Sequence, residues 1–202
     1  MFDSLFKQFA VVAPVDWVGM ISGIIGVCLS IKERLSAWPF FILCYSAYVY
    51  ISFRSGYYAF SAMNAGFIFI AIYGWLKWAG VVGHGDDSGR GLKISALPGR
   101  FWLLVFAFVA ASTLTIGLLL SQMDAARLPF IDAFAVSNAL VAQWLLSRKY
   151  IENWIFWIVS DFVYIYLFLN DRLWPSILLF GAFILLAIKG WFDWQRSIRN
   201  NI

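Results

Sequence analysis

Seven long apolar segments, separated by mostly short polar connections, constrain this chain more than any other feature. A helix needs about 20 predominantly apolar residues to cross the hydrocarbon layer of a membrane. The composition agrees, because hydrophobic residues make up 62% and charged residues 13% of the chain, against about 45–50% and about 25% in ordinary soluble domains. The sequence therefore predicts an all-α polytopic membrane protein, with transmembrane helices over residues 14–31, 37–53, 57–79, 101–121, 129–147, 151–169 and 173–192.

The first three segments recur as the last three. Gly74 and Gly190 are 116 residues apart, and at this offset GFIFIAIYGWLKW aligns with AFILLAIKGWFDW without a gap. The same offset pairs identical residues elsewhere: Trp38 with Trp154, Tyr48 with Tyr164, and Asp16 with Asp132. A shift of four helices gives both halves one orientation, as in the parallel repeats of SWEET transporters. We expect a 3+1+3 architecture: a three-helix repeat over 14–79, a cytoplasmic linker loop over 80–100, a linking helix over 101–121 and a second repeat over 129–194.

Lysine and arginine predict the orientation of the chain. One set of connections, together with the C-terminal end, carries 11 of these residues, and the opposite face carries 4. Because basic residues concentrate on the cytoplasmic side, we expect a cytoplasmic C-terminus and an outside N-terminus. The net charge of +4 is then explained by membrane topology and by contact with anionic lipid. No run of basic residues is long enough to indicate nucleic-acid binding. The glycine-rich connection 80–100 reads as a flexible surface loop.

The sixth span carries the most unusual residue, Asp161. Trp154, Trp157, Asp161 and Tyr164 recur at spacings of 3, 4 and 3, which places them on one helical face. A carboxylate near mid-span costs about 2.5–3.5 kcal/mol on insertion scales, so it should face the bundle interior and find a partner. The matching stripe of the second span has Tyr45 at this position. Two facing aromatic stripes, one bearing an acid, suit a flat, cationic ligand.

Structural explanations for the same residues remain open. Tryptophans near span ends often lie in the interfacial belt, which applies to Trp38, to Trp154 and to both Gly-Trp-x-x-Trp motifs. Asp161 and the buried amides can also bridge helices, and Asp16 and Asp132 can cap helix N-termini. The candidate binding residues are Trp38, Tyr45, Tyr48, Asn64, Asn138, Gln143, Trp154, Trp157, Asp161 and Tyr164. We expect no enzyme, metal or cofactor site, because the only histidine, His84, lies in a connection.

Four motifs resemble the PnuC family of bacterial vitamin transporters. These are the Trp-Pro that opens the second span, YGWLKW at the end of the third, the Asp-Ala that opens the fifth, and RKYIENWIFWIVSD leading into the sixth. The similarity extends from about residue 14 to residue 196. The chain departs from the family pattern where Phe60 replaces an acid, Asn64 replaces a glutamine and Phe180 lacks a hydroxyl.

The resemblance implies facilitated diffusion of a vitamin across the bacterial inner membrane, without ATP. It also implies a homotrimer, and trapping of the vitamin by a cytoplasmic kinase after entry. In the family the Trp-x-x-Trp of the sixth span, here Trp154 and Trp157, belongs to the substrate site. Nicotinamide riboside is the expected substrate, held between the halves; thiamine, riboflavin and proton-coupled transport through Asp161 remain alternatives. A phosphorylated vitamin should be rejected, since no lysine or arginine lies at mid-span.

Overall fold

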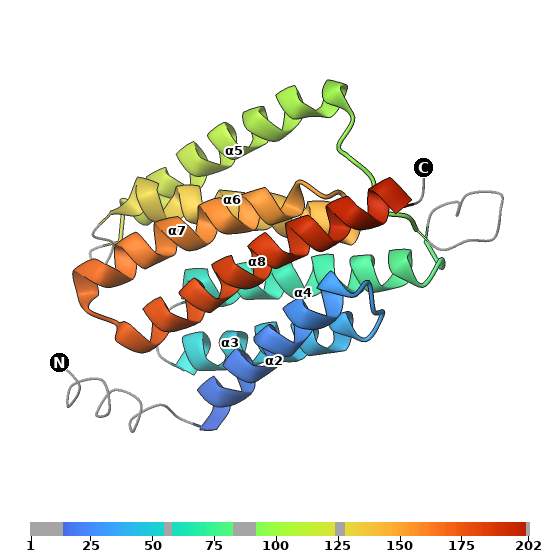
Figure 1. The fold of residues 1–202 in the computed structure, drawn as a ribbon. Coiled ribbons are helices and arrows are strands. Elements are labelled where there is room, and N and C mark those ends of the chain that lie inside the picture. The colour runs from blue at the N-terminus through green and yellow to red at the C-terminus, as the bar shows by residue number, and fades with distance from the viewer. Residues whose placement is uncertain (1–13, 55–57, 83–91, 124–127, 201–202) are drawn as a thin grey trace. The chain divides into compact units, whose positions relative to one another are not determined.

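The computed structural model describes residues 14–54, 58–82, 92–123 and 128–200, without the side chains of residues 58–60 and 171. The described residues form helices α2 (Pro14–Ile31), α3 (Ala37–Arg54), α4 (Tyr58–Trp78), α5 (Gly99–Leu120), α6 (Pro129–Ser147), α7 (Asn153–Asp171) and α8 (Trp174–Asn200), shown in Figure 1. The chain divides into two compact units, which are described separately. Unit 1 extends to Lys93 and contains α2 to α4, and unit 2 begins at Ile94 and contains α5 to α8.

The predicted helical fold is confirmed. Six of the seven helices begin and end within two residues of the predicted bounds, and α8 continues to Asn200, beyond the predicted end. Within the part of the chain that the structure describes, five helices, α2, α5, α6, α7 and α8, are long and apolar enough to cross a membrane. Helix α3 is 18 residues long, but its tyrosines, Trp38, Pro39 and Arg54 lower its hydropathy. The structure is therefore that of a multi-pass membrane protein.

In unit 1, α3 packs against both α2 and α4. Small residues on the neighbouring helices make room for the large side chains of α3. A methyl group added at Gly26 of α2 would lie 2.7 Å from the ring of Phe41, and one at Gly19 would lie 3.3 Å from the ring of Tyr48. On the α4 side, the ring of Trp38 covers the backbone of Gly74.

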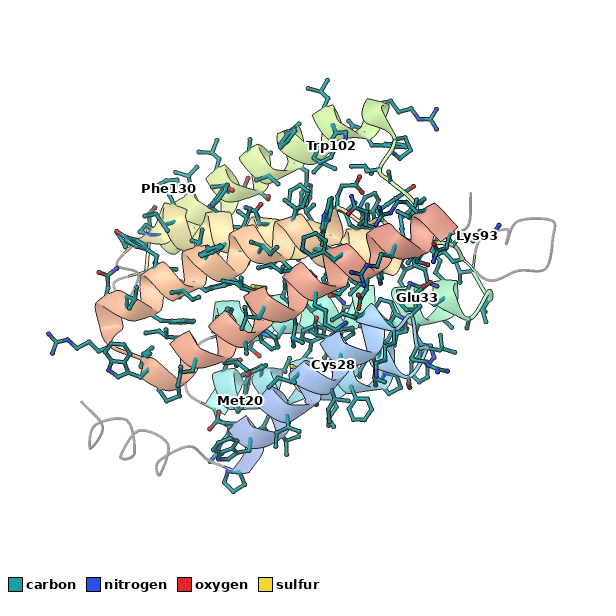
Figure 2. The ribbon with its side chains drawn as sticks, in the orientation of Figure 1. Met20, Cys28, Glu33, Lys93, Trp102 and Phe130 are labelled. Carbon is teal, nitrogen blue, oxygen red and sulfur yellow. The ribbon has the colours of Figure 1, made fainter. Side chains whose placement is uncertain are left out.

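In unit 2, α7 packs against both α6 and α8, and α5 packs against α6 (Figure 1). The Ser160 hydroxyl of α7 donates a hydrogen bond to the Ala135 carbonyl of α6 at 2.9 Å, which fixes the register of these two helices. On the opposite side of α7, a methyl group at Gly190 of α8 would lie 2.6 Å from the indole of Trp154. Phe130 at the start of α6, labelled in Figure 2, covers Gly117 of α5 in the same way.

The two Gly-Trp-x-x-Trp motifs form equivalent packing sites inside their own units. The glycine and the second tryptophan are four residues apart and share one helical face. Trp38 meets Trp78 edge to face at 5.2 Å between ring centroids, and Trp154 meets Trp194 in the same way at 5.3 Å. Trp78 and Trp194 are 8% and 1% exposed, so the expectation that both lie in the membrane interface is wrong for these two residues. The first tryptophans of the motifs, Trp75 and Trp191, retain exposed surface.

The turn between α2 and α3 in unit 1 has the same conformation as the turn between α6 and α7 in unit 2. Glu33, labelled in Figure 2, and Lys149 stand at the 116-residue offset and share a left-handed backbone with φ of 54°. Three backbone hydrogen bonds recur at this offset, with N···O distances of 2.9 to 3.3 Å. In unit 1 they run from Glu33 N to Ser30 O, from Arg34 N to Leu29 O and from Trp38 N to Leu35 O. In unit 2 they run from Lys149 N to Leu146 O, from Tyr150 N to Leu145 O and from Trp154 N to Ile151 O. Each turn thereby sets the angle at which its buried tryptophan enters the next helix.

Residues 94–98, which we call the strap, are ordered. The predicted flexible loop over 80–100 is therefore wrong for its last part, while residues 83–91 lie outside the described chain. Ser95 forms an isolated parallel β-bridge with Tyr150, and the Leu97 N–H donates to the Glu152 carboxylate at 2.9 Å. Ile94 and Leu97 are buried. These two buried residues are three positions apart, and so short an apolar pattern produces no hydropathy peak.

Replacing Glu152 with alanine should loosen the strap. The buried Leu97 N–H would lose its acceptor, at a cost of about 1–3 kcal/mol. We expect faster hydrogen exchange at Leu97 and a lower unfolding temperature for Glu152→Ala, with near wild-type values for Glu152→Gln, which keeps an acceptor oxygen. The control is Ser36→Ala, because Ser36 is the exposed residue at the equivalent position of unit 1. Unchanged exchange at Leu97 in Glu152→Ala would contradict this role.

Candidate functional site

The carboxyl group of Asp161 is the most unusual feature of unit 2. It stands in the middle of α7 and is only 4% exposed. Among the described residues, no hydrogen bond or ion pair reaches it. The neighbouring Ser160 donates its hydroxyl hydrogen to α6, which ties the backbone that carries Asp161 to that helix. A fixed, buried and unpartnered carboxyl group is a candidate ligand for a cation.

Tyr164, one turn further along α7, begins a wall of aromatic rings. Its ring stacks on Phe168 at 5.8 Å between centroids, with 14° between the planes. Phe180 of α8 closes against both rings, at 5.2 Å from Tyr164 and 5.3 Å from Phe168. Asp161 precedes Tyr164 by three residues and so lies on the same face of α7. An acidic group beside stacked aromatic rings suits a flat cationic ligand.

The two tryptophans of α7 lie in different surroundings. Trp154 is 2% exposed and is covered by Gly190 and Trp194; its buried indole nitrogen has no hydrogen-bond partner among the described residues. It therefore does not lie in a membrane-interface belt. Trp157 keeps part of its surface exposed and packs against the buried cluster Leu97, Val105, Val109, Val141, Ala142, Leu145 and Phe156. Of these two tryptophans, Trp157 is therefore the one whose side chain stays partly exposed in this conformation.

The predicted polar residues of α4 and α6 are all buried. Asn138 donates to the Phe134 carbonyl of its own helix at 2.8 Å, which leaves its side-chain oxygen for other contacts. Asn64 and Gln143 are buried as well and have partners within the protein. All three amides therefore contribute to helix packing in this conformation.

In unit 1 the predicted residues form a continuous aromatic ladder. Trp38 meets Phe41 edge to face at 5.9 Å, and Phe41 stacks on Tyr45 at 6.2 Å. Tyr45 stacks in turn on Phe67 of α4 at 5.1 Å. Trp38 is 0% exposed, which excludes a membrane-interface position for it too. Tyr48 lies three residues beyond Tyr45 on α3 and meets Gly19 of α2.

Asp132 also lies near this site, although the sequence did not identify it as a candidate binding residue. The expectation that Asp132 caps α6 is wrong, because Leu128 occupies the N-cap position and Asp132 lies within the first turn. The half-buried carboxyl group instead stands at the level of Tyr164, by the register that the Ser160–Ala135 hydrogen bond sets between α6 and α7. Helical periodicity alone did not reveal this pair, because it depends on the register between α6 and α7.

Comparisons with known proteins agree with this structure. The profile of the family described as nicotinamide mononucleotide transporter matches residues 13–196. The nicotinamide riboside transporter PnuC of Escherichia coli (strain K12) is 24% identical, over 92% of this chain and 86% of that protein. The riboflavin/roseoflavin transporter RibM of Streptomyces davaonensis is 29% identical, over 92% of this chain and 87% of that protein.

A solved structure has the same fold. The crystal structure of the vitamin B3 transporter PnuC superposes with a TM-score of 0.74 and covers 98% of this chain and 88% of that chain, at 23% sequence identity. The matching profile spans nearly the whole chain. The resemblance found in the sequence motifs is thereby confirmed, and the chain belongs to the nicotinamide mononucleotide transporter family, the PnuC family of membrane transporters.

Proposed function

We propose that this protein carries an unphosphorylated, cationic vitamin across the bacterial inner membrane by facilitated diffusion, and that nicotinamide riboside is its substrate. The observation that carries the proposal is Asp161, a mid-span carboxyl group that is buried without a partner among the described residues. In its carboxylate form Asp161 would pair with the positive pyridinium ring of that nucleoside, and the aromatic wall beside it would stack on the ring. The names of relatives such as the Escherichia coli PnuC support the same substrate.

Asp161 and Tyr164 would bind the cationic ring, and Trp157 would stack on it. Trp154 would support this site from its packed position against Gly190. The buried amides Asn138 and Gln143 carry the donors and acceptors that a ribose requires. A phosphorylated vitamin finds no match, because no lysine or arginine stands near the middle of a predicted span. Trapping by a cytoplasmic kinase after entry is proposed from the family resemblance, and this selectivity supports it.

The transporter would contain seven spans arranged as 3+1+3 parallel repeats, with α5 as the linking helix. The matched turns at Glu33 and Lys149 and the matched tryptophan–glycine contacts support a duplication. The distribution of basic residues, 11 against 4, supports a cytoplasmic C-terminus. Family membership supports a homotrimer.

Riboflavin transport is the second candidate, because the relative RibM shares 29% identity with this chain. The two vitamins differ in charge: the flavin is neutral and gains little from Asp161. A buried acid without a partner therefore favours the cationic vitamin.

Calorimetric titration of the purified protein tests the proposal. We expect saturable binding of nicotinamide riboside, and no binding of nicotinamide mononucleotide, which adds a phosphate. Liposomes containing the protein should take up nicotinamide riboside without an imposed proton gradient. If only riboflavin or thiamine binds, that vitamin is the substrate instead of nicotinamide riboside. Uptake that requires a proton gradient would contradict facilitated diffusion.

A further inference from the structure

Asp132 and Tyr164 lie at the same level of unit 2. The hydrogen bond from Ser160 to the Ala135 carbonyl fixes α7 beside α6 at one point. These helices are antiparallel, because a turn of five residues joins them. Tyr164 is four residues beyond Ser160, and Asp132 is three residues before Ala135. At a rise of about 1.5 Å per residue these steps move about 6 and about 4.5 Å in the same direction.

Tyr164 therefore stands between two carboxyl groups. Asp132 of α6 lies at its level by this register, and Asp161 lies one helical turn deeper on α7. Asp132 is close to the N-terminal end of α6 and only half-buried, whereas Asp161 is buried near mid-span. The two acids and the tyrosine form a short ladder from the end of the helices toward their middle.

Unit 1 repeats only part of this ladder. Asp16 and Tyr48 hold the positions of Asp132 and Tyr164 at the 116-residue offset. The position of Asp161, however, is held by Tyr45, which stacks on Phe67. Two carboxyl groups around one tyrosine therefore occur in unit 2 alone among the described equivalent positions. A duplicated scaffold with an acid added to one copy suggests that the added charge serves a ligand.

We propose that Asp132 is a specificity-determining residue that captures the cationic ring of the substrate at the end of α6 and delivers it past Tyr164 to Asp161. This inference rests on the proposed function and adds an outer binding step to it. Asp132 attracts the positive charge while the ring is still partly hydrated, and Asp161 holds it after desolvation. Outer charges of this kind act mainly on the association rate and on its dependence on salt.

The test compares Asp132→Asn with Asp16→Asn, the matched change in unit 1. We expect the association rate constant of nicotinamide riboside, measured by stopped-flow tryptophan fluorescence, to fall about tenfold in Asp132→Asn and less than twofold in Asp16→Asn. The dependence of that rate on salt should weaken only in Asp132→Asn. Asp132→Glu should recover most of the rate, because it restores the charge.

A neutral probe separates charge from structure. Dihydronicotinamide riboside has nearly the same shape but an uncharged ring, so Asp132→Asn should change its association rate less than twofold. Equal losses for both probes, or equal losses in both variants, would overturn the role of Asp132. If the wild-type protein binds no cationic vitamin, the proposed function fails as well; if it binds one and Asp132→Asn behaves like the wild type, only this inference fails.

Discussion

Replacing Gly190 with alanine should strongly destabilise unit 2, although it adds only one methyl group. The new methyl carbon would lie 2.6 Å from the Trp154 indole, whose rigid ring also meets Trp194 edge to face. Overpacking of this kind costs about 1–3 kcal/mol, and occasionally more. We expect a lower unfolding temperature and a smaller yield of monodisperse protein in detergent. Gly74→Ala should act in the same way on unit 1, because its methyl group would meet Trp38.

The same two helices supply the controls. A methyl group at Gly181 of α8 or at Gly66 of α4 would meet nothing within 4 Å. Because alanine favours helix over glycine by about 1 kcal/mol, Gly181→Ala and Gly66→Ala should leave stability unchanged or raise it. If Gly190→Ala and Gly181→Ala unfold at the same temperature, the tryptophan–glycine contact is not a source of stability.

The sequence predicted the helices well because their length and apolar character are local properties. The bounds of α2 and α6, for example, agree with the predicted segments at both ends. The repeat was also visible, since identical residues such as Trp38 and Trp154 recur at one offset. Hydropathy does not show which side of a helix meets a neighbour, however. Trp78 and Trp194 were for this reason assigned to the membrane interface, although they pack inside their units.

The candidate site was predictable in part, for a similar reason. Asp161 is conspicuous in the sequence because a charged residue at mid-span is costly. Its surroundings depend on the register between helices, which no local pattern encodes. The stripe on α7 is consequently divided: Trp154 meets α8, whereas Trp157 packs against a cluster that includes residues of α5 and α6. The relation of Asp132 to Tyr164 likewise depends on a single hydrogen bond between α6 and α7.

Replacing Asp161 with asparagine should abolish most binding of a cationic vitamin. A hydrogen bond to a charged group contributes about 1.5–3 kcal/mol, which corresponds to about a 10- to 150-fold loss of affinity. The same change should raise the unfolding temperature of the ligand-free protein, because a buried carboxyl group without a partner destabilises the fold. A loss of affinity together with a gain in stability distinguishes a ligand-binding acid from one that bridges helices, whose removal would lower both.

The control for Asp161→Asn is Asp193→Asn, which removes an acid of α8 that pairs with Lys189 on the same helix. A surface pair of this kind contributes about 0–1 kcal/mol, so affinity and uptake should stay within about twofold of the wild type. Uptake of nicotinamide riboside into liposomes, measured across a range of pH values for both variants, also tests the proton-coupled alternative. If Asp161→Asn takes up the vitamin at the wild-type rate at every pH, Asp161 neither binds the cationic ring nor carries a proton, and the charge that selects the substrate must lie elsewhere on the chain.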